Sequence, residues 1–257
     1  MKLKVLLKVI SLVLLSLYEV NATRGLQTNK ETNKARELNQ QGLAAAAAGH
    51  LNEAAELFNA AIKAAPEFAV PYNNLGASYN ALGRYDEAVV LFLRAIYLDK
   101  KYAEAYYNLG DAYLKLEQYP NAVKAYEQAL QVKPNFSEAQ NSLGVAYNNW
   151  GKRREAIEAY AAAIRLRPGY PEAFNNLGTA LTETGKYEQA IACFHQAAAL
   201  KPNWALPRYN LGVLFLRKND RDSALAQYRS LAAMSSQFAE KLYGGIYRGK
   251  VLVVSNR

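Results

Sequence analysis

Side chains that could do chemistry are few in this chain of 257 residues. It holds two histidines, His50 and His195, and one cysteine, Cys193. Neither histidine has a cysteine or carboxylate pattern at metal-ligand spacing near it, so we predict ordinary surface histidines. A lone cysteine excludes an intramolecular disulfide and a cysteine-based zinc site, and we predict that it is buried and inert. No phosphate loop or nucleophile motif occurs, so we predict a non-enzyme with no metal and no cofactor.

The elements that carry these residues repeat at a fixed period. The pair Leu-Gly recurs every 34 residues from Leu75-Gly76 to Leu211-Gly212, and Gln41-Gly42 falls one step earlier. Alanine and aromatic columns keep the same phase, for example Ala88 and Phe92 in the second unit. Six units follow without a gap, at 35–68, 69–102, 103–136, 137–170, 171–204 and 205–238.

The spacing within a unit predicts two antiparallel helices. Columns three and four residues apart lie on one face of a helix, and small residues let two helices approach closely. Proline occurs only at unit ends or in the first turn of an expected helix. The turn between the two helices carries a glycine in four units, which suits a left-handed C-cap. Those residues are Gly49, Gly83, Gly151 and Gly185. Asn219 is the next best choice in the last unit, whereas Glu117 in the third is expected to be strained.

This pattern, Leu-Gly-x-x-Tyr, then Ala-x-x-x-Phe, then Pro, resembles the tetratricopeptide repeat over residues 35–238. The resemblance implies an all-α fold, a right-handed α-solenoid of six helix-turn-helix repeats. It also implies a concave groove lined by the first helix of each repeat. Because the ends of such an array need covers, residues 239–248 are expected to form a capping helix. Leu242, Ile246 and Tyr243 would face inward.

Asparagine occupies four of the six units in each of two adjacent columns of the first helix, which we number positions 5 and 6 of the unit. The eight asparagines are Asn39, Asn73, Asn141 and Asn175 at position 5, and Asn74, Asn108, Asn176 and Asn210 at position 6. An amide has an acceptor and two donors, so such a row can bind a peptide backbone whatever its side chains. The position 6 column is similar to the asparagine-lined repeats of the O-linked N-acetylglucosamine transferases, and the resemblance implies peptide binding for its four asparagines alone. A catalytic domain like that of those enzymes is not expected here. We predict peptide binding by these eight residues; the alternative is that the amides brace the helices internally.

Another precedent in the family does not fit. Repeats that bind acidic chaperone tails use lysine and arginine in the groove. At those columns this chain has Asn39, Leu43, Asn74 and Glu104. The formal net charge is nevertheless +9, with its excess towards the C-terminal end. Two turns are basic, Lys152-Arg153-Arg154 and the one with Arg217, Lys218 and Arg221. They could attract acidic segments or an anionic membrane, although solvated turns are the simpler interpretation. No nucleic acid partner is expected.

The ends of the chain are interpreted separately. Residues 1–22 have a basic start and an apolar stretch of about 14 residues, too short to span a bilayer, and end in Val-Asn-Ala. We predict a cleaved secretion signal; an uncleaved membrane anchor is the alternative. Residues 23–34 are expected to be a flexible lead-in. Residues 239–257 would form the capping helix and a tail. In the tail, Val251 to Val254 is apolar and β-prone, and it could fold back on the array or pair elsewhere.

Taken together, the sequence predicts an exported scaffold, periplasmic or secreted. It would bind a peptide segment of a partner protein, with cell-envelope assembly as a working hypothesis. Two alternatives remain open. The chain could be a non-catalytic subunit of an envelope enzyme complex, or a structural array that associates with itself through its termini. The partner and the oligomeric state do not follow from the sequence.

Overall fold

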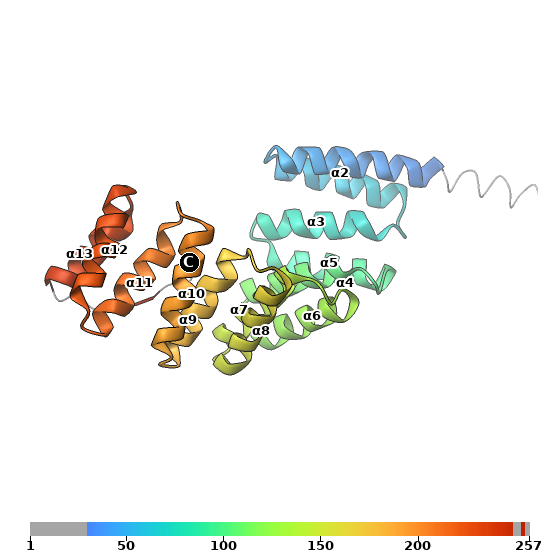
Figure 1. Cartoon of the computed structure of the whole chain (residues 1–257). Coiled ribbons are helices and arrows are strands. Elements are labelled where there is room, and N and C mark those ends of the chain that lie inside the picture. Colours follow the sequence, from blue (N-terminus) through green and yellow to red (C-terminus); the bar gives the residue numbers. More distant parts are fainter. Residues whose placement is uncertain (1–29, 249–252, 255–257) are drawn as a thin grey trace, which may run out of the picture. The chain divides into compact units, whose positions relative to one another are not determined.

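The computed structural model describes residues 30–248 and 253–254 (Figure 1). In this part of the chain there are helices and no strands, so the predicted all-α class is confirmed. A first helix includes residues 30–47. It is followed by α2 (Leu51–Ala64), α3 (Ala69–Ala81), α4 (Tyr85–Leu98), α5 (Ala103–Lys115), α6 (Tyr119–Val132), α7 (Ser137–Asn149), α8 (Arg153–Leu166), α9 (Pro171–Glu183), α10 (Tyr187–Leu200), α11 (Ala205–Arg217), α12 (Arg221–Ala233) and α13 (Gln237–Arg248).

The described part of the chain divides into two compact units, with the boundary between Ala112 and Tyr113, inside α5. In the first unit, α3 packs against α2 and α4. In the second, each helix from α6 to α13 packs against the next, and α9 also contacts α7 and α11. The first helix of each repeat is called the A helix here, so α9 has the A helices of both neighbouring repeats beside it.

In four repeats, the two helices approach closely where a glycine lies against an aromatic ring. A Cβ on Gly76 would lie 2.7 Å from the Phe92 ring, and a Cβ on Gly178 would lie 2.6 Å from the Phe194 ring. Both rings are fully buried. Any larger residue at these glycines would push the ring away, so the close approach expected from the small and aromatic columns is confirmed. The last repeat differs, because Gly212 faces Leu242 of α13.

The turns between paired helices adopt the left-handed conformation that the sequence predicts. Gly49, Gly83, Gly151 and Gly185 have φ between 76° and 83°. Asn219 and Glu117 take the same conformation with φ of 59° and 58°. Asparagine tolerates this region, whereas glutamate has no compensating local hydrogen bond to offer and is strained there. Ser235 is a third such residue, with φ of 51°, in the turn before α13.

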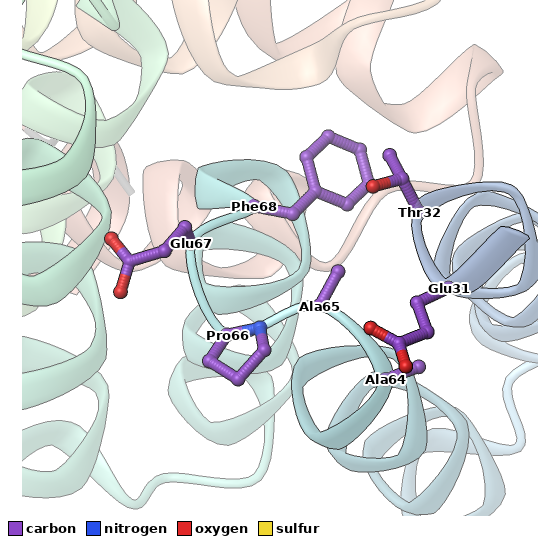
Figure 2. A pocket seen from close by; sticks show the side chains of 7 residues that line it. All are labelled: Glu31, Thr32, Ala64, Ala65, Pro66, Glu67 and Phe68. Atoms are coloured by element: carbon purple, nitrogen blue, oxygen red, sulfur yellow. The ribbon is translucent and has the colours of Figure 1, made fainter. Parts of the chain in front are cut away.

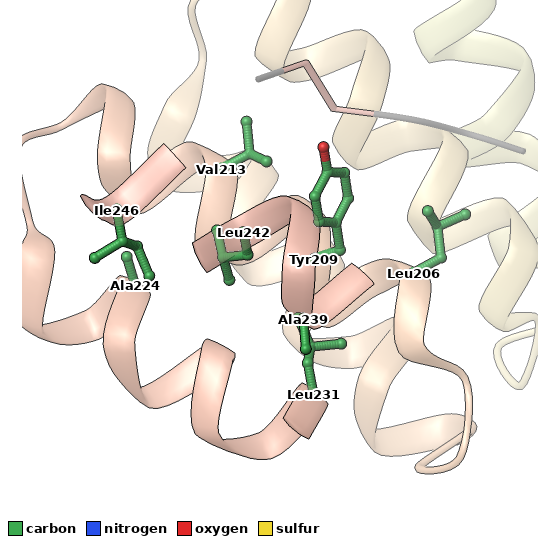
Figure 3. Close-up of a cluster of buried hydrophobic side chains, with 8 residues drawn as sticks. All are labelled: Leu206, Tyr209, Val213, Ala224, Leu231, Ala239, Leu242 and Ile246. Carbon is green, nitrogen blue, oxygen red and sulfur yellow. The ribbon is translucent and has the colours of Figure 1, made fainter. Parts of the chain in front are cut away.

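The ends of the array differ from the prediction in two places. The first helix already includes residues 30–34, which the sequence had assigned to a flexible lead-in. At the other end α13 covers the last repeat as expected, with Leu242 and Ile246 buried (Figure 3). Tyr243, in contrast, is 37% exposed and lies against Tyr228 and Tyr247 at centroid distances of 5.8 and 4.6 Å. It sits one residue from Leu242, and adjacent residues of a helix cannot share its inner face.

The predicted signal, residues 1–22, lies outside the described residues. Among residues 30–248 and 253–254, no helix is both long and apolar enough to cross a membrane.

Candidate interaction face

The asparagines of positions 5 and 6 form hydrogen-bonded pairs between neighbouring A helices. In the first unit, Asn74 Nδ2 donates to Asn39 Oδ1 at 2.9 Å, and Asn108 Nδ2 donates to Asn73 Oδ1 at 2.9 Å. In the second, Asn176 donates to Asn141 at 3.1 Å and Asn210 to Asn175 at 3.0 Å. Each pair spans 35 residues, so in all four pairs position 6 of one repeat donates to position 5 of the repeat before it.

Burial divides the eight asparagines into two groups. Asn39, Asn73, Asn175, Asn176 and Asn210 are buried, whereas Asn74, Asn108 and Asn141 are partly exposed. A buried amide must find a partner within the protein, because leaving it without one costs about 1–3 kcal/mol. The pairing meets this need and fixes the spacing of the A helices. For the five buried residues, the hydrogen bonds favour the internal brace, the alternative interpretation of the sequence. Peptide contact by the amide row stays a prediction.

One buried amide is incompletely paired. Asn175 has no exposed surface, and its Oδ1 accepts from Asn210, but its Nδ2 has no hydrogen-bond partner. Four residues further along α9, Thr179 donates its hydroxyl to the Asn175 backbone carbonyl at 3.1 Å. Asn175 therefore has an unused donor on the same helix face as Thr179.

A second recurrent feature was not recognised in the sequence. The last position of every unit is aromatic, at Phe68, Tyr102, Phe136, Tyr170, Trp204 and Phe238. Three of these rings lie under a cation three residues earlier, with Arg167 3.6 Å from the Tyr170 centroid, Lys133 4.4 Å from Phe136 and Lys201 5.4 Å from Trp204. The aromatic column could have been found by the same 34-residue comparison that revealed the leucines and glycines.

Two of these cations also pair with a carboxylate on the first turn of an A helix. Arg167 bonds Glu138 at 2.7 Å, and Lys201 bonds Glu172 at 3.1 Å. The pKa of the Glu138 carboxyl is lowered overall. Burial alone would raise this pKa, but hydrogen bonds from the Glu138 backbone and Ser137, together with the charge of Arg167, outweigh the effect of burial. These side chains are about half exposed, and such ion pairs contribute little to stability. The result is an ordered border of charged and aromatic groups at the start of α7 and α9.

The basic turns are engaged within the chain. Arg153 forms an ion pair with Glu183 at 2.8 Å, and the Lys152 ammonium lies 3.6 Å from the Trp150 ring centroid. Lys218 pairs with Glu188, and Arg221 lies 5.1 Å from the centroid of Tyr247. Four basic side chains of these turns therefore have partners within the chain, and attraction of an acidic segment or an anionic membrane is not tested by these contacts.

The residues best suited to catalysis or metal binding do not lie together in one site. His50 and His195 are exposed, and no group of His, Cys, Asp and Glu in the described residues could hold a metal ion. Cys193 is half-buried, and burial raises the pKa of its thiol to about 11, so it is a weak nucleophile near neutral pH.

A pocket of about 360 Å³ lies in the first unit, between the start of the first helix and the turn from α2 to α3 (Figure 2). It is lined by Glu31, Thr32 and residues 64–68. Most of its wall is apolar, made by Ala64, Ala65, Pro66 and Phe68, and its two carboxylates point in different directions (Figure 2). This is packing space beside a turn and holds no set of groups for catalysis.

Among solved structures, tetratricopeptide-repeat proteins are similar to this chain. MamA shares 27% identity, with 63% of this chain and 94% of that chain covered and a TM-score of 0.58. YrrB, described as a tetratricopeptide-repeat protein with an unusual peptide-binding site, shares 26% identity, with 76% and 99% covered and a TM-score of 0.61. PilF of Pseudomonas aeruginosa has a TM-score of 0.73 and covers 84% and 99%, but at 19% identity it supports the fold alone.

Sequence comparison agrees with the structural likeness. No curated protein sequence matches the chain significantly. Models of the tetratricopeptide repeat match residues 67–135, 107–171, 159–192 and 178–219, which together span residues 67–219 without a gap. The leucine, glycine and aromatic columns, the helix pairs and these matches lead to one conclusion: the chain is a member of the tetratricopeptide-repeat family, whose fold serves as a scaffold for protein–protein interaction.

Proposed function

We propose that this protein is a non-catalytic scaffold that binds an extended peptide segment of a partner along its A helices. The observation that carries the proposal is the row of paired amides. Asn74, Asn108 and Asn141 are partly exposed and are each held by a bond to an asparagine of an adjacent repeat. An amide fixed in this way loses little conformational entropy when it binds a ligand.

The chemistry of the row suits a main-chain ligand. An asparagine amide has four hydrogen-bonding sites, and the pairing uses only some of them. Within one unit, amides repeated from helix to helix can meet successive peptide groups of one extended chain. Residues such as Glu138 and Glu172 at the start of the A helices would then select side chains. The peptide-binding site named for YrrB, at 26% identity, supports binding of this kind.

We also propose that the scaffold works in the cell envelope, as a binding component of an assembly. This part rests on the signal predicted at residues 1–22. Expression of the full chain, followed by cell fractionation and N-terminal sequencing of the product, tests it. A mature N-terminus at Thr23 is expected. A protein that stays in the cytoplasm with residues 1–22 intact would contradict the proposal.

Peptide binding is tested by selecting ligands for residues 23–257 from a displayed library of random peptides and measuring their affinity by titration calorimetry. The variant Asn74→Ala with Asn108→Ala removes two partly exposed amides of the first unit. A loss of about tenfold or more is expected, since each hydrogen bond contributes about 0.5–1.5 kcal/mol. Asn52→Ala is the control, an exposed asparagine on α2, which is not an A helix. Unchanged affinity in the double variant, with helicity by circular dichroism intact, would argue against the amide row as the site.

A further inference from the structure

The A-helix surface changes character in the last two repeats. On α7, positions 2, 5, 9 and 12 are Glu138, Asn141, Val145 and Asn148, all partly exposed. The corresponding residues on α11 are Leu206, Tyr209, Val213 and Leu216. Their spacing places them on one face of the helix, and that face is entirely apolar except for the tyrosine hydroxyl. The first three of the α11 residues are buried.

Helix α13 covers part of this apolar face. Ala239, Leu242 and Ile246 of α13 belong to the same buried cluster as Leu206, Tyr209 and Val213 (Figure 3). Phe238 lies 5.0 Å from Tyr209 between ring centroids. This is the capping contact that the end of a helical array requires.

A second, separate segment reaches the same region. Val254 packs against the cluster of Leu206, Tyr209 and Val213 and also against the neighbouring cluster that contains Leu181, Leu211 and Leu214. Val253 beside it is 64% exposed and belongs to neither cluster. Residues 253 and 254 have no secondary structure. One valine facing in and its neighbour facing out is the alternation of an extended chain laid on a surface.

The adjoining face of α9 is buried too. Thr179 and Thr182 are 4% and 3% exposed, although their counterparts on α7, Val145 and Asn148, are partly exposed. Between them and the start of α9 lies Asn175, fully buried with its Nδ2 unpaired. A buried donor without an acceptor is unfavourable, and it can be satisfied by a peptide carbonyl. The α9 face therefore carries an unpaired donor next to α11, whose Asn210 bonds the same side chain.

We propose that the faces of α9 and α11 form a binding site for an extended aliphatic peptide, and that the chain's own Val253–Val254 occupies it as an internal ligand. A partner segment would have to displace these residues, so they lower the apparent affinity of the partner at this end of the array. The inference rests on the proposed function, because it assigns a ligand class and a competitor to one part of the A-helix surface. Val254 anchors the internal ligand, and Val253 does not.

The test uses a fluorescent peptide of residues 249–257 with blocked ends and measures its binding by anisotropy to two proteins. One is the full chain from residue 23, and the other ends at Arg248. The shortened protein is expected to bind the peptide about tenfold or more tightly than the full chain does, because its site is vacant. In the full chain, Val254→Asp should open the site in the same way, which covers the case that the shortened protein does not fold.

Matched peptides give the control. A peptide with Val254→Asp should lose about tenfold or more in affinity for the shortened protein, whereas one with Val253→Asp should bind like the original. Equal binding to both proteins, no binding to either, or equal loss with both substituted peptides would overturn the proposal. A full chain that sediments as a dimer and becomes monomeric when ended at Arg248 would also overturn it, because the segment would then occupy a second copy. The amides Asn74 and Asn108 are not part of this site, so either proposal can fail alone.

Discussion

Asn210 donates its amide to Asn175 at 3.0 Å, and the two residues lie in neighbouring A helices 35 positions apart. Both side chains are fully buried. Two buried amides in an otherwise apolar array fix how far one helix pair can slide along the next, because any shift would separate a donor from its acceptor in a site that water does not reach.

The first prediction measures this coupling. Asn175→Ala and Asn210→Ala should each lower the free energy of unfolding by about 1–3 kcal/mol, since each leaves a buried amide without its partner. The double variant should cost clearly less than the sum, because no amide is then left unpaired. Urea unfolding followed by circular dichroism gives the four values of the cycle.

The control for this cycle is the pair Asn121 and Gln118, whose amides bond at 2.9 Å on the exposed surface. Water can replace that bond, so its coupling energy should be close to zero. Equal coupling energies in the two cycles would show that the bond between Asn175 and Asn210 stabilises the fold no more than a bond on the surface does.

The second prediction concerns the approach of paired helices. In Gly178→Ala the added Cβ would lie 2.6 Å from the Phe194 ring, which is buried and cannot move aside. We expect a loss of about 1–3 kcal/mol in unfolding free energy. Gly169→Ala is the control, because a Cβ there meets nothing within 4 Å. A melting temperature of Gly178→Ala equal to that of the control would mean that the helices separate freely.

Much of the fold follows from the sequence because its columns record contacts within one repeat. The glycine of Leu-Gly and the aromatic ring that meets it lie in the same 34-residue unit, so a single period places Gly178 against Phe194. The left-handed turns follow for the same reason. Residues 30–34 were assigned to a flexible lead-in because they are polar and have no pattern that marks the start of a helix. They are helical because the helix that they begin is anchored by the next residue, Ala35, which is fully buried.

The amide pairs were harder to predict because they join two repeats. The signal exists as a correlation across 35 residues. Where position 5 is asparagine, position 6 of the next repeat is also asparagine, as in Asn39 and Asn74. Where position 5 is tyrosine, at Tyr107 and Tyr209, the residue 35 positions later is small, Ser142 or Gly244. When each column is considered alone, the asparagines are interpreted as surface residues. Only the correlation between the two columns indicates that an asparagine at position 5 bonds one at position 6 of the next repeat.

The third prediction tests the strained turn at Glu117, where φ is 58°. Glu117→Gly should raise the unfolding free energy by about 0.5–1 kcal/mol, because glycine adopts this conformation without the Cβ penalty. Gly185→Ala is the reverse change at φ 76° in open space, and it should be destabilising by a similar amount. If Glu117→Gly were less stable than the parent, a favourable interaction of the glutamate would have to outweigh the strain.

The last prediction uses Cys193, the only cysteine of the chain. Burial raises its pKa from 9.0 to about 11. Because the folded value is above the unfolded one, the thiol's contribution to stability is complete below pH 9 and is lost as the pH approaches 11. Only the thiolate reacts with iodoacetamide, so alkylation of the native protein should reach half its maximal rate near pH 11, and alkylation in urea near pH 9. A native profile centred near pH 9 would show that the sulfur is in water, and the packing of α10 beside it would need revision.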